Sequence, residues 1–318
     1  MSTSDEMDTD LVIEWLNYKK IPFFRLNDED LMNGNTSISY DLNNKVLIEN
    51  SFAKISIQDV KIIWFRKFGF LDDYSEKIGR NTDLMRYIFS EFLNIRNFLI
   101  ELLSDKKWLF DRKIAVSKME MLRVAKNVNI KTPNTLICSR KKDLELFFRK
   151  NNKSLITKSI GDVGFVKYKN VEFTLNTTKI EKIDEFKEVF SPSLFQEHID
   201  KLIEIRTFYL DKKCYSMAIF SQSNEKTKLD FRNYDKDKPN RFVPYQLPKQ
   251  LEERIVDFME AINLNTGSLD FIKSKKNGDY YFLEVNPCGQ FGMMSNPCNY
   301  NLHEKVADYI KKELYEGC

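Results

Sequence analysis

The sequence predicts a mixed α/β or α+β protein with two or three parts, each built around its own core. Segments with apolar residues at helical spacing, such as 84–102 and 249–264, alternate with short segments rich in β-branched and aromatic residues. At 318 residues, the chain is longer than a single core usually serves. Hydrophobic residues make up 42% of it and include 25 Phe, which is enough apolar material for more than one core.

The composition excludes several classes of protein. The net charge of +3 is small and the charged residues are interspersed, which argues against a nucleic-acid partner. No apolar run approaches the roughly 18 residues of a membrane span, and the polar start Met1–Glu6 is unlike a secretory signal. The five Cys are dispersed like reduced thiols, so we expect a cytoplasmic protein without a membrane partner. With only His198 and His303 available, a His-based zinc site or a Ser-His-Asp triad is hard to assemble.

The first part, expected over 1–110, begins with a helix. Apolar residues at helical spacing predict this helix over 9–19 and a longer amphipathic helix over 84–102. A helix before the first strand is unusual for an α/β unit. Strands are expected over 22–26, 37–40, 45–48 and 62–65.

The central part is expected over 111–192 and the last part over 193–318. In the central part we expect helices at 115–128 and 143–150, strands at 132–137 and 155–159, and a loop at 161–164. In the last part we expect strands at 194–199, 204–210 and 214–220, a polar loop at 221–240, and helices at 249–264 and 302–314.

A β-hairpin is expected after the helix at 249–264. Asn277-Gly278 lies between two β-rich segments, and this dipeptide is the strongest short signal for a hairpin turn. Side chains alternate along a strand, so Glu284 and Asn286 share one face, and strand pairing can bring Asp270 to that face. Two carboxylates and an amide oxygen suit a hard cation such as Mg²⁺, which completes its shell with water and phosphate oxygens. The alternative is two ordinary strands whose polar residues face water.

Lys158 ends an apolar strand directly before Gly161-Asp162-Val163-Gly164. Glycines let a backbone approach phosphates closely, and a lysine beside them supplies a positive charge. A hairpin turn that contains glycine is the alternative explanation.

The segment Phe195–Ile199 is expected to join the central and last parts. Its backbone N–H and C=O groups can pair with a purine edge while apolar neighbours cover the faces of the ring. Glu204 is then within reach of a ribose, and Arg206 shares its face and could reach the phosphates. An exposed strand with an Arg–Glu pair is equally compatible with the pattern.

In their order along the chain, these features resemble the ATP-grasp superfamily. They run from about Lys113 to the C-terminus and comprise Lys113, Lys158, a glycine loop, Phe195–Ile199, Glu204–Arg206, Asp270 and Glu284–Pro287. The resemblance implies an ATP-grasp fold, in which an N-terminal α/β lobe precedes a central and a C-terminal lobe that grip ATP between them. The absence of a strand before the first helix departs from this pattern.

The resemblance also implies an ATP-dependent ligase with ATP and Mg²⁺ as cofactors. In that superfamily a carboxylate is phosphorylated to an acyl phosphate, which a nucleophile then attacks. Carried over to this chain, Lys113 and Lys158 would hold phosphates, and Gln196, Glu197 and Ile199 would form the hinge at adenine. Glu204 would bind ribose, and Asp270, Glu284 and Asn286 would hold Mg²⁺.

A narrower likeness concerns the graspetide, or microviridin-type, ligases. It rests on Ile63–Lys67, Asp230-Phe231-Arg232, Arg241–Tyr245 and Asn286–Phe291, and the tail 286–307 resembles the "grasp-with-spasm" branch. Enzymes of that family bind the leader of a ribosomal precursor peptide, activate Asp or Glu side chains in its acidic core, and join them to Ser, Thr or Lys. The likeness therefore implies a peptide macrocyclase that forms ω-ester or ω-amide rings.

Phosphoryl transfer needs positioning and neutralisation of charge more than a protein nucleophile. Arg206, Arg232 and Arg241 are the expected catalytic cations, with Arg232 acting on the reacting carboxylate or the transferred phosphoryl group. Arg232 and Arg241 could instead be solvated surface charges.

Two other functions remain open from the sequence. The chain could be a ligase that adds a free amino acid to a protein or peptide terminus, or a nucleotide-binding protein without turnover. The precursor, the ring pattern, ester versus amide, and the oligomeric state stay undetermined, with a homodimer as one option.

Overall fold

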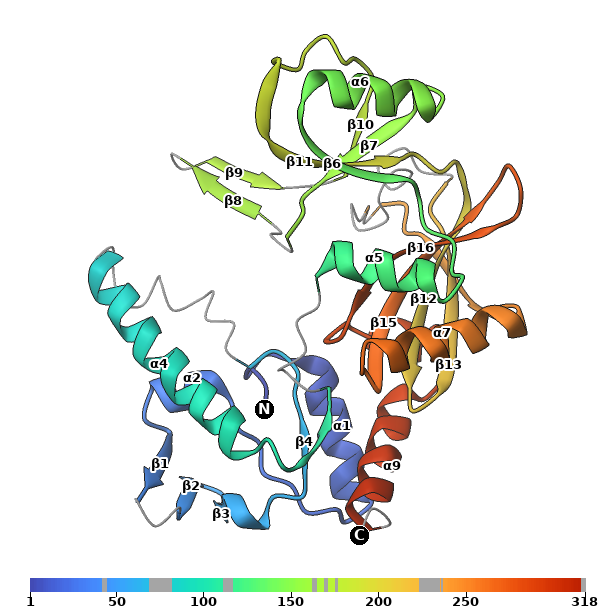
Figure 1. Ribbon diagram of the computed structural model, residues 1–318. Coiled ribbons are helices and arrows are strands. Elements are labelled where there is room, and N and C mark those ends of the chain that lie inside the picture. The colour runs from blue at the N-terminus through green and yellow to red at the C-terminus, as the bar shows by residue number, and fades with distance from the viewer. Residues whose placement is uncertain are drawn as a thin grey trace. The chain divides into compact units, whose positions relative to one another are not determined.

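Figure 1 shows the computed structural model, which describes residues 1–41, 45–68, 82–110, 117–161, 165–168, 171–174, 177–222, 235 and 237–315. The chain forms two compact units. The first comprises Met1–Ile114, Leu264–Gly267 and Pro287–Cys318, and the second comprises Ala115–Asn263 and Ser268–Asn286. Each unit mixes helices and sheets, as the sequence predicted. The finer division at 1–110, 111–192 and 193–318 stays a prediction.

In the first unit, helix α1 (Met7–Tyr18) packs against helix α9 (Leu302–Tyr315). Lys19, directly after α1, reinforces this packing through ion pairs to Glu304 and Asp308 of α9, at 3.0 and 2.8 Å. Strands β1 (Thr36–Tyr40), β2 (Val46–Asn50) and β3 (Lys54–Ser56) form an antiparallel sheet, and β4 (Ile62–Trp64) pairs in parallel with β5 (Lys107–Leu109). The other elements among the described residues of this unit are α2 (Asp28–Met32), the 3₁₀ helix η1 (Ile57–Asp59), α4 (Thr82–Leu102) and α8 (Gly292–Ser295).

The strand expected over 22–26 is wrong, because residues 22–26 belong to no strand of the described chain. The Arg25 guanidinium instead donates to the Asn27 side chain and to the carbonyl of Thr3, each at 2.8 Å. These side-chain contacts, together with a single bridge between Ser2 and Asn27, hold the segment without a strand ladder.

The described residues of the second unit form two larger sheets and a two-stranded hairpin (Figure 1). The antiparallel four-stranded sheet has the order β10 (Thr178–Ile180), β7 (Leu155–Lys158), β11 (Val189–Glu197) and β6 (Thr135–Arg140). Helix α6 (Lys141–Lys150) covers one face of it, and Leu144 packs there with Leu155 and Phe195 in a buried apolar cluster. Strands β8 (Phe165–Tyr168) and β9 (Val171–Thr174) form a separate hairpin.

The five-stranded sheet has the order β14 (Arg241–Tyr245), β13 (Lys213–Phe220), β12 (Lys201–Leu210), β15 (Thr266–Ser274) and β16 (Tyr280–Asn286). Helix α7 (Lys249–Ala261) packs on it, with the ring centroids of Phe258 and Phe282 5.0 Å apart. Helix α5 (Lys118–Asn127) lies beside β16.

The predicted hairpin is confirmed, and β15 pairs with β16 in antiparallel register. Its turn is closed by bonds from the Ser274 N–H to Asp279 O at 2.8 Å and from the Gly278 N–H to Ser274 O at 3.0 Å. Gly278 has a φ of +72°, a conformation that glycine adopts without steric cost, which explains why Asn277-Gly278 marks this turn.

In the part of the chain that the structure describes, no helix combines the length and hydropathy that crossing a membrane requires.

Candidate functional site

A pocket in the second unit gathers most of the residues that the sequence singled out. Its walls come from β7 and β11 of the four-stranded sheet and from β12, β13, β15 and β16 of the five-stranded sheet. Ile156, Ile219 and Leu283 give it apolar walls that suit a flat ring. The predicted site residues that line it are Lys158, Gln196, Glu197, Ile199, Glu204, Asp270 and Glu284.

Five predicted residues are placed elsewhere or are not described. Arg206 and Asn286 lie on β12 and β16 without lining this pocket. Arg241 is exposed on the edge strand β14, where its guanidinium lies 5.9 Å from the centroid of the Phe220 ring. Lys113, Arg232 and residues 162–164 of the glycine loop lie outside the described residues. The roles predicted for all of these residues stay predictions.

The hairpin places four polar side chains on one face. Asp270 pairs directly with Glu284, and Ser268 with Asn286, so these four side chains project from the same side of the two strands. Leu269 and Val285, which form the intervening pair, are buried on the other face. A β-bulge directly after Asp270 changes the register there.

Two cations lie next to the carboxylates of this face. Like charges directly opposite each other on paired strands destabilise a sheet. Arg206 Nη1 lies 3.7 Å from Asp270 Oδ1, and Lys118 Nζ lies 3.6 Å from Glu284 Oε2. Each carboxylate therefore has its own positive partner within the second unit.

Lys118 is a candidate site residue that the sequence did not single out, and it lies beside two of the predicted features. It is the first residue of α5, and its Nζ also donates to the carbonyl of Ser159 at 3.4 Å, two residues before Gly161. It therefore joins the start of the predicted phosphate loop to a predicted metal ligand. The sequence offered one signal for Lys118. It is a lysine directly after the N-cap residue Ser117, at the start of a helix that the sequence did predict.

The donor set on the hairpin face fits Mg²⁺. The described residues contain no group of three or more His, Cys, Asp or Glu side chains able to hold a metal. Mg²⁺ is usually bound through one or two carboxylates while water and phosphate oxygens complete its shell, so Asp270 and Glu284, with the Asn286 amide oxygen beside them, nevertheless suit it. Ser268 Oγ and Arg206 Nε are buried without a hydrogen-bond partner in the described chain, and such orphaned groups mark places where a ligand or water binds.

Gln196 offers an acceptor to the pocket. Thr135 Oγ1 donates its proton to Pro133 O at 2.9 Å, so it can only accept from Gln196 Nε2, also at 2.9 Å. This chain of bonds fixes the orientation of the amide. The other end, Gln196 Oε1, is buried and lacks a partner among the described residues.

Two further pocket residues, Glu197 and Glu204, already form hydrogen bonds within the protein. The Glu197 N–H donates to Asn134 O at 2.8 Å, so this N–H is already used within the protein. Glu204 Oε1 accepts from Lys201 Nζ at 2.5 Å and from Ser221 Oγ at 2.7 Å. Both donors belong to the second unit and hold the Glu204 carboxylate in place.

A family model, the RimK-like ATP-grasp domain, matches residues 115–310. The chain belongs to this family. The predicted superfamily is therefore confirmed. The sequence also predicted an ATP-dependent ligase, and this activity agrees with the family. ATP-grasp ligases use ATP with Mg²⁺, which agrees with the donor set of the hairpin face. No curated protein matches the sequence.

Solved structures share the fold over nearly the whole chain. A Chryseobacterium gregarium RiPP-associated ATP-grasp ligase, in complex with ADP and a leader and core peptide, has a TM-score of 0.84 at 23% identity and covers 98% of this chain and 96% of its own. The macrocyclase MdnC from Microcystis aeruginosa MRC, bound with the precursor peptide MdnA, has a TM-score of 0.80 at 21% identity, with 97% of each chain covered. The ATP-grasp ligase PsnB, complexed with a minimal precursor, Mg and ADP, has a TM-score of 0.76 at 12% identity and covers 98% of this chain and 95% of its own.

We expect the buried acceptor Gln196 Oε1 to favour adenine over other bases of a bound nucleotide. Adenine carries an amino group that can donate to Oε1, whereas hypoxanthine carries a carbonyl at the same position. Loss of one buried acceptor is worth about 1–3 kcal/mol. We therefore expect Gln196→Met to lower the preference for ADP over IDP about fivefold or more, measured as the ratio of the two dissociation constants by calorimetry.

The ratio compares ADP and IDP on the same variant, so a general loss of stability affects both dissociation constants alike. This matters because Gln196 is fully buried, and its replacement can destabilise the protein. Gln246→Met, at an exposed glutamine in the same unit, serves as the control and should leave the ratio unchanged. An unaltered ratio in Gln196→Met would show that Oε1 does not face the base.

Proposed function

We propose that this chain uses ATP to activate Asp and Glu side chains of a ribosomal precursor peptide and joins them to Ser, Thr or Lys of the same peptide. The products are macrolactone or macrolactam rings. The observation that carries this proposal is the extent of the structural likeness. MdnC and the Chryseobacterium ligase cover 97% and 98% of this chain, so the likeness includes the first unit as well as the matched ATP-grasp domain.

The reaction proceeds in two steps. A peptide carboxylate oxygen attacks the γ-phosphorus of ATP, the bond to the β-phosphate oxygen breaks, and ADP leaves. The hydroxyl or amine then attacks the carbonyl carbon of the acyl phosphate, its proton passes to solvent, and phosphate leaves. Each ring therefore removes one water from the peptide.

Most of the residues that serve these steps belong to the second unit. Lys158 and Lys118 hold the phosphates, and Arg206 neutralises charge that develops during transfer. Gln196, Glu197 and Ile199 contact adenine, and Glu204 contacts ribose. Asp270, Glu284 and Asn286 hold Mg²⁺, which, when bound, screens the phosphate charge. Lys113, Arg232 and Arg241 keep the phosphate-binding and catalytic roles that the sequence predicts.

The partner in this proposal is a precursor peptide with a leader and an acidic core, and the reaction takes place in the cytoplasm. We also propose that the enzyme is a homodimer. Helix α4 supports this, because its Leu84, Tyr87, Ile95 and Phe98 side chains are 40–63% exposed and form an apolar surface in water. Light scattering of the purified chain measures the oligomeric state.

Membership of the RimK-like family favours a second candidate, the ligase that adds free amino acids to a peptide or protein terminus. Mass spectrometry separates the two functions. We expect incubation with ATP, Mg²⁺ and an acidic peptide encoded beside this chain's gene to remove one water per ring. A gain of mass that depends on an added free amino acid would favour the second candidate, and absence of ATP hydrolysis in every mixture would favour a binding protein without turnover.

A further inference from the structure

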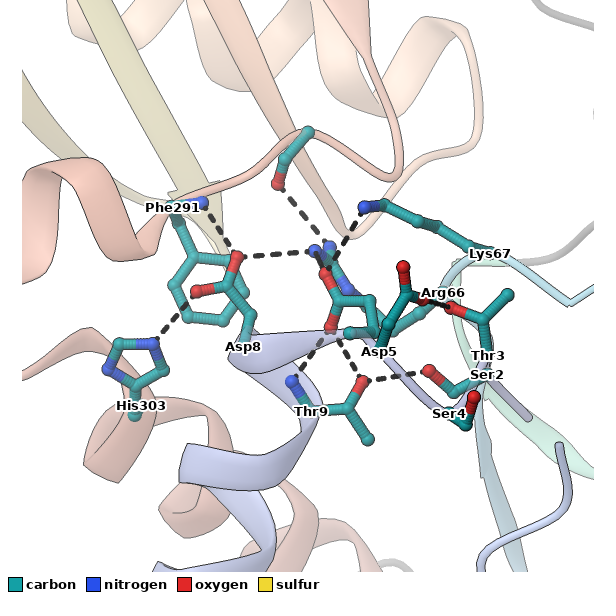
Figure 2. Close-up of polar contacts among 12 residues, drawn as sticks. Ser2, Thr3, Ser4, Asp5, Asp8, Thr9, Arg66, Lys67, Phe291 and His303 are labelled. Atoms are coloured by element: carbon teal, nitrogen blue, oxygen red, sulfur yellow. Dashed lines mark hydrogen bonds and ion pairs between the residues drawn. The ribbon is translucent and has the colours of Figure 1, made fainter. Parts of the chain in front are cut away.

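The first unit contains a buried cluster of charged side chains that the proposed reaction does not use (Figure 2). Arg66 is only 3% exposed, and its Nη2 lies 2.8 Å from Glu6 Oε1 and 3.3 Å from Asp8 Oδ2. The other Asp8 oxygen lies 2.9 Å from His303 Nε2. We call Glu6, Asp8, Arg66 and His303 the clamp.

Asp8 carries a negative charge inside this cluster. Burial by itself raises the pKa of its carboxyl. The hydrogen bond to His303, the charge of Arg66 and the Phe291 N–H outweigh burial and leave the pKa below its ordinary value. At neutral pH, Asp8 is therefore an anion that accepts hydrogen bonds with both oxygens.

The clamp holds the backbone of the segment Gly289–Phe291. Arg66 Nη1 donates to Gly289 O at 3.3 Å, and the Phe291 N–H donates to Asp8 Oδ2 at 3.2 Å. The Arg66 guanidinium also lies 5.3 Å from the centroid of the Phe291 ring. The motifs Ile63–Lys67 and Asn286–Phe291, which the sequence singled out separately, are thus in direct contact within the first unit.

The fit of this segment against the clamp is close. Phe291 is 1% exposed, and its ring centroid lies 5.0 Å from that of His303. A Cβ on Gly292 would collide with the Asp8 carboxylate. Position 292 therefore leaves no room for a side chain beside Asp8.

Gln290 is the exposed residue between the two clamped backbone groups. It follows the predicted Mg²⁺ ligand Asn286 by four positions. Buried charged side chains hold the backbone on both sides of Gln290. A side chain on a backbone fixed in this way is pre-organised for contact with a ligand.

We propose that Gln290 contacts the main chain of the peptide substrate and that Asp8 and Arg66 are positioning residues that hold it for this contact. The proposal rests on the proposed function for the identity of the substrate. A carboxamide offers two donors and an acceptor, so it can pair with both the C=O and the N–H of an extended peptide. Such pairing is independent of peptide sequence, which suits an enzyme that acts on both Asp and Glu side chains of a precursor.

The test compares Gln290→Ala with Asn296→Ala, a matched change at an exposed residue of the same unit. The probe is a fluorescently labelled acidic peptide encoded beside this chain's gene, and its affinity is measured by anisotropy. We expect Gln290→Ala to weaken peptide binding about five- to tenfold, as loss of a hydrogen-bonding group does. ADP binding should stay the same in both variants, and Asn296→Ala should bind the peptide like the wild type.

Positioning by the clamp is tested with Asp8→Asn. We expect it to weaken peptide binding like Gln290→Ala, and the double variant to be no weaker than either single variant, because both changes remove one contact. If the losses of peptide affinity in the two single variants add up in the double variant, the clamp has only a structural role. The same conclusion follows if Asp8→Asn lowers thermal stability without changing peptide affinity. Unchanged affinity in Gln290→Ala, or no peptide binding by the wild type, would overturn the proposal.

The binding measurement and the cyclisation assay are independent. If the wild type cyclises a precursor that Gln290→Ala binds equally well, the inference fails and the proposed function stands. If the wild type binds the peptide through Gln290 without removing water, the proposed function fails and the contact stands.

Discussion

Glu284→Gln is expected to abolish ATP-dependent turnover while the protein stays folded. The change keeps the shape of the side chain and removes the charge that faces Asp270 across the hairpin. A neutral amide is a poorer ligand for Mg²⁺ than a carboxylate. Loss of one electrostatic contact at a transferring group lowers kcat on the order of 10²–10³-fold, and loss of a metal ligand should cost at least as much. Asp270→Asn is expected to behave alike.

Steady-state ATP hydrolysis with a confirmed precursor measures this effect at several Mg²⁺ concentrations. Asp279→Asn is the matched control, because it makes the same chemical change at the turn of the same hairpin, where Asp279 bonds Lys131 and Asn277. The control should retain activity. Near-normal rates in both Glu284→Gln and Asp270→Asn would remove the metal assignment from the hairpin.

Lys118→Met is expected to weaken binding of Mg²⁺–ADP about tenfold to a hundredfold. Methionine keeps an apolar stem of similar length and removes the charge that lies beside Ser159 and Glu284. Hydrogen bonds to charged groups contribute about 1.5–3 kcal/mol, and each 1.4 kcal/mol is a tenfold change in affinity. Calorimetry with ADP measures the change without need of a precursor.

Lys126→Met, in the last turn of the same helix, is the control for loss of a lysine from α5. The double variant Lys118→Met/Glu284→Gln separates two roles of Lys118. If Lys118 only neutralises Glu284, its removal should have no effect once Glu284 is neutral. If it holds phosphate, affinity should fall in both backgrounds. Unchanged ADP affinity in Lys118→Met alone would exclude a phosphate role.

The sequence by itself determined the features that depend on neighbours along the chain. Asn277-Gly278 predicted the hairpin because a turn with φ above zero is a local requirement. The two-residue period of a strand placed Glu284 and Asn286 on one face, and the pairing of β15 with β16 adds Asp270. The order of the motifs predicted the ATP-grasp family, which the match over residues 115–310 confirms.

The tertiary structure decided which side chains meet when they are far apart in sequence. Lys118 and Glu284, or Asp8 and His303, are brought together by packing of whole elements, and no local period reports such a contact. The same holds for Gln196, since its orphan acceptor depends on Thr135 and Pro133 from another strand and loop. The prediction of a strand over 22–26 was wrong for the same reason, because it depended on contacts with residues far apart in sequence. Its residues have β-like composition, but Arg25 bonds Thr3 and Asn27, and strand pairing needs a partner that local sequence cannot supply.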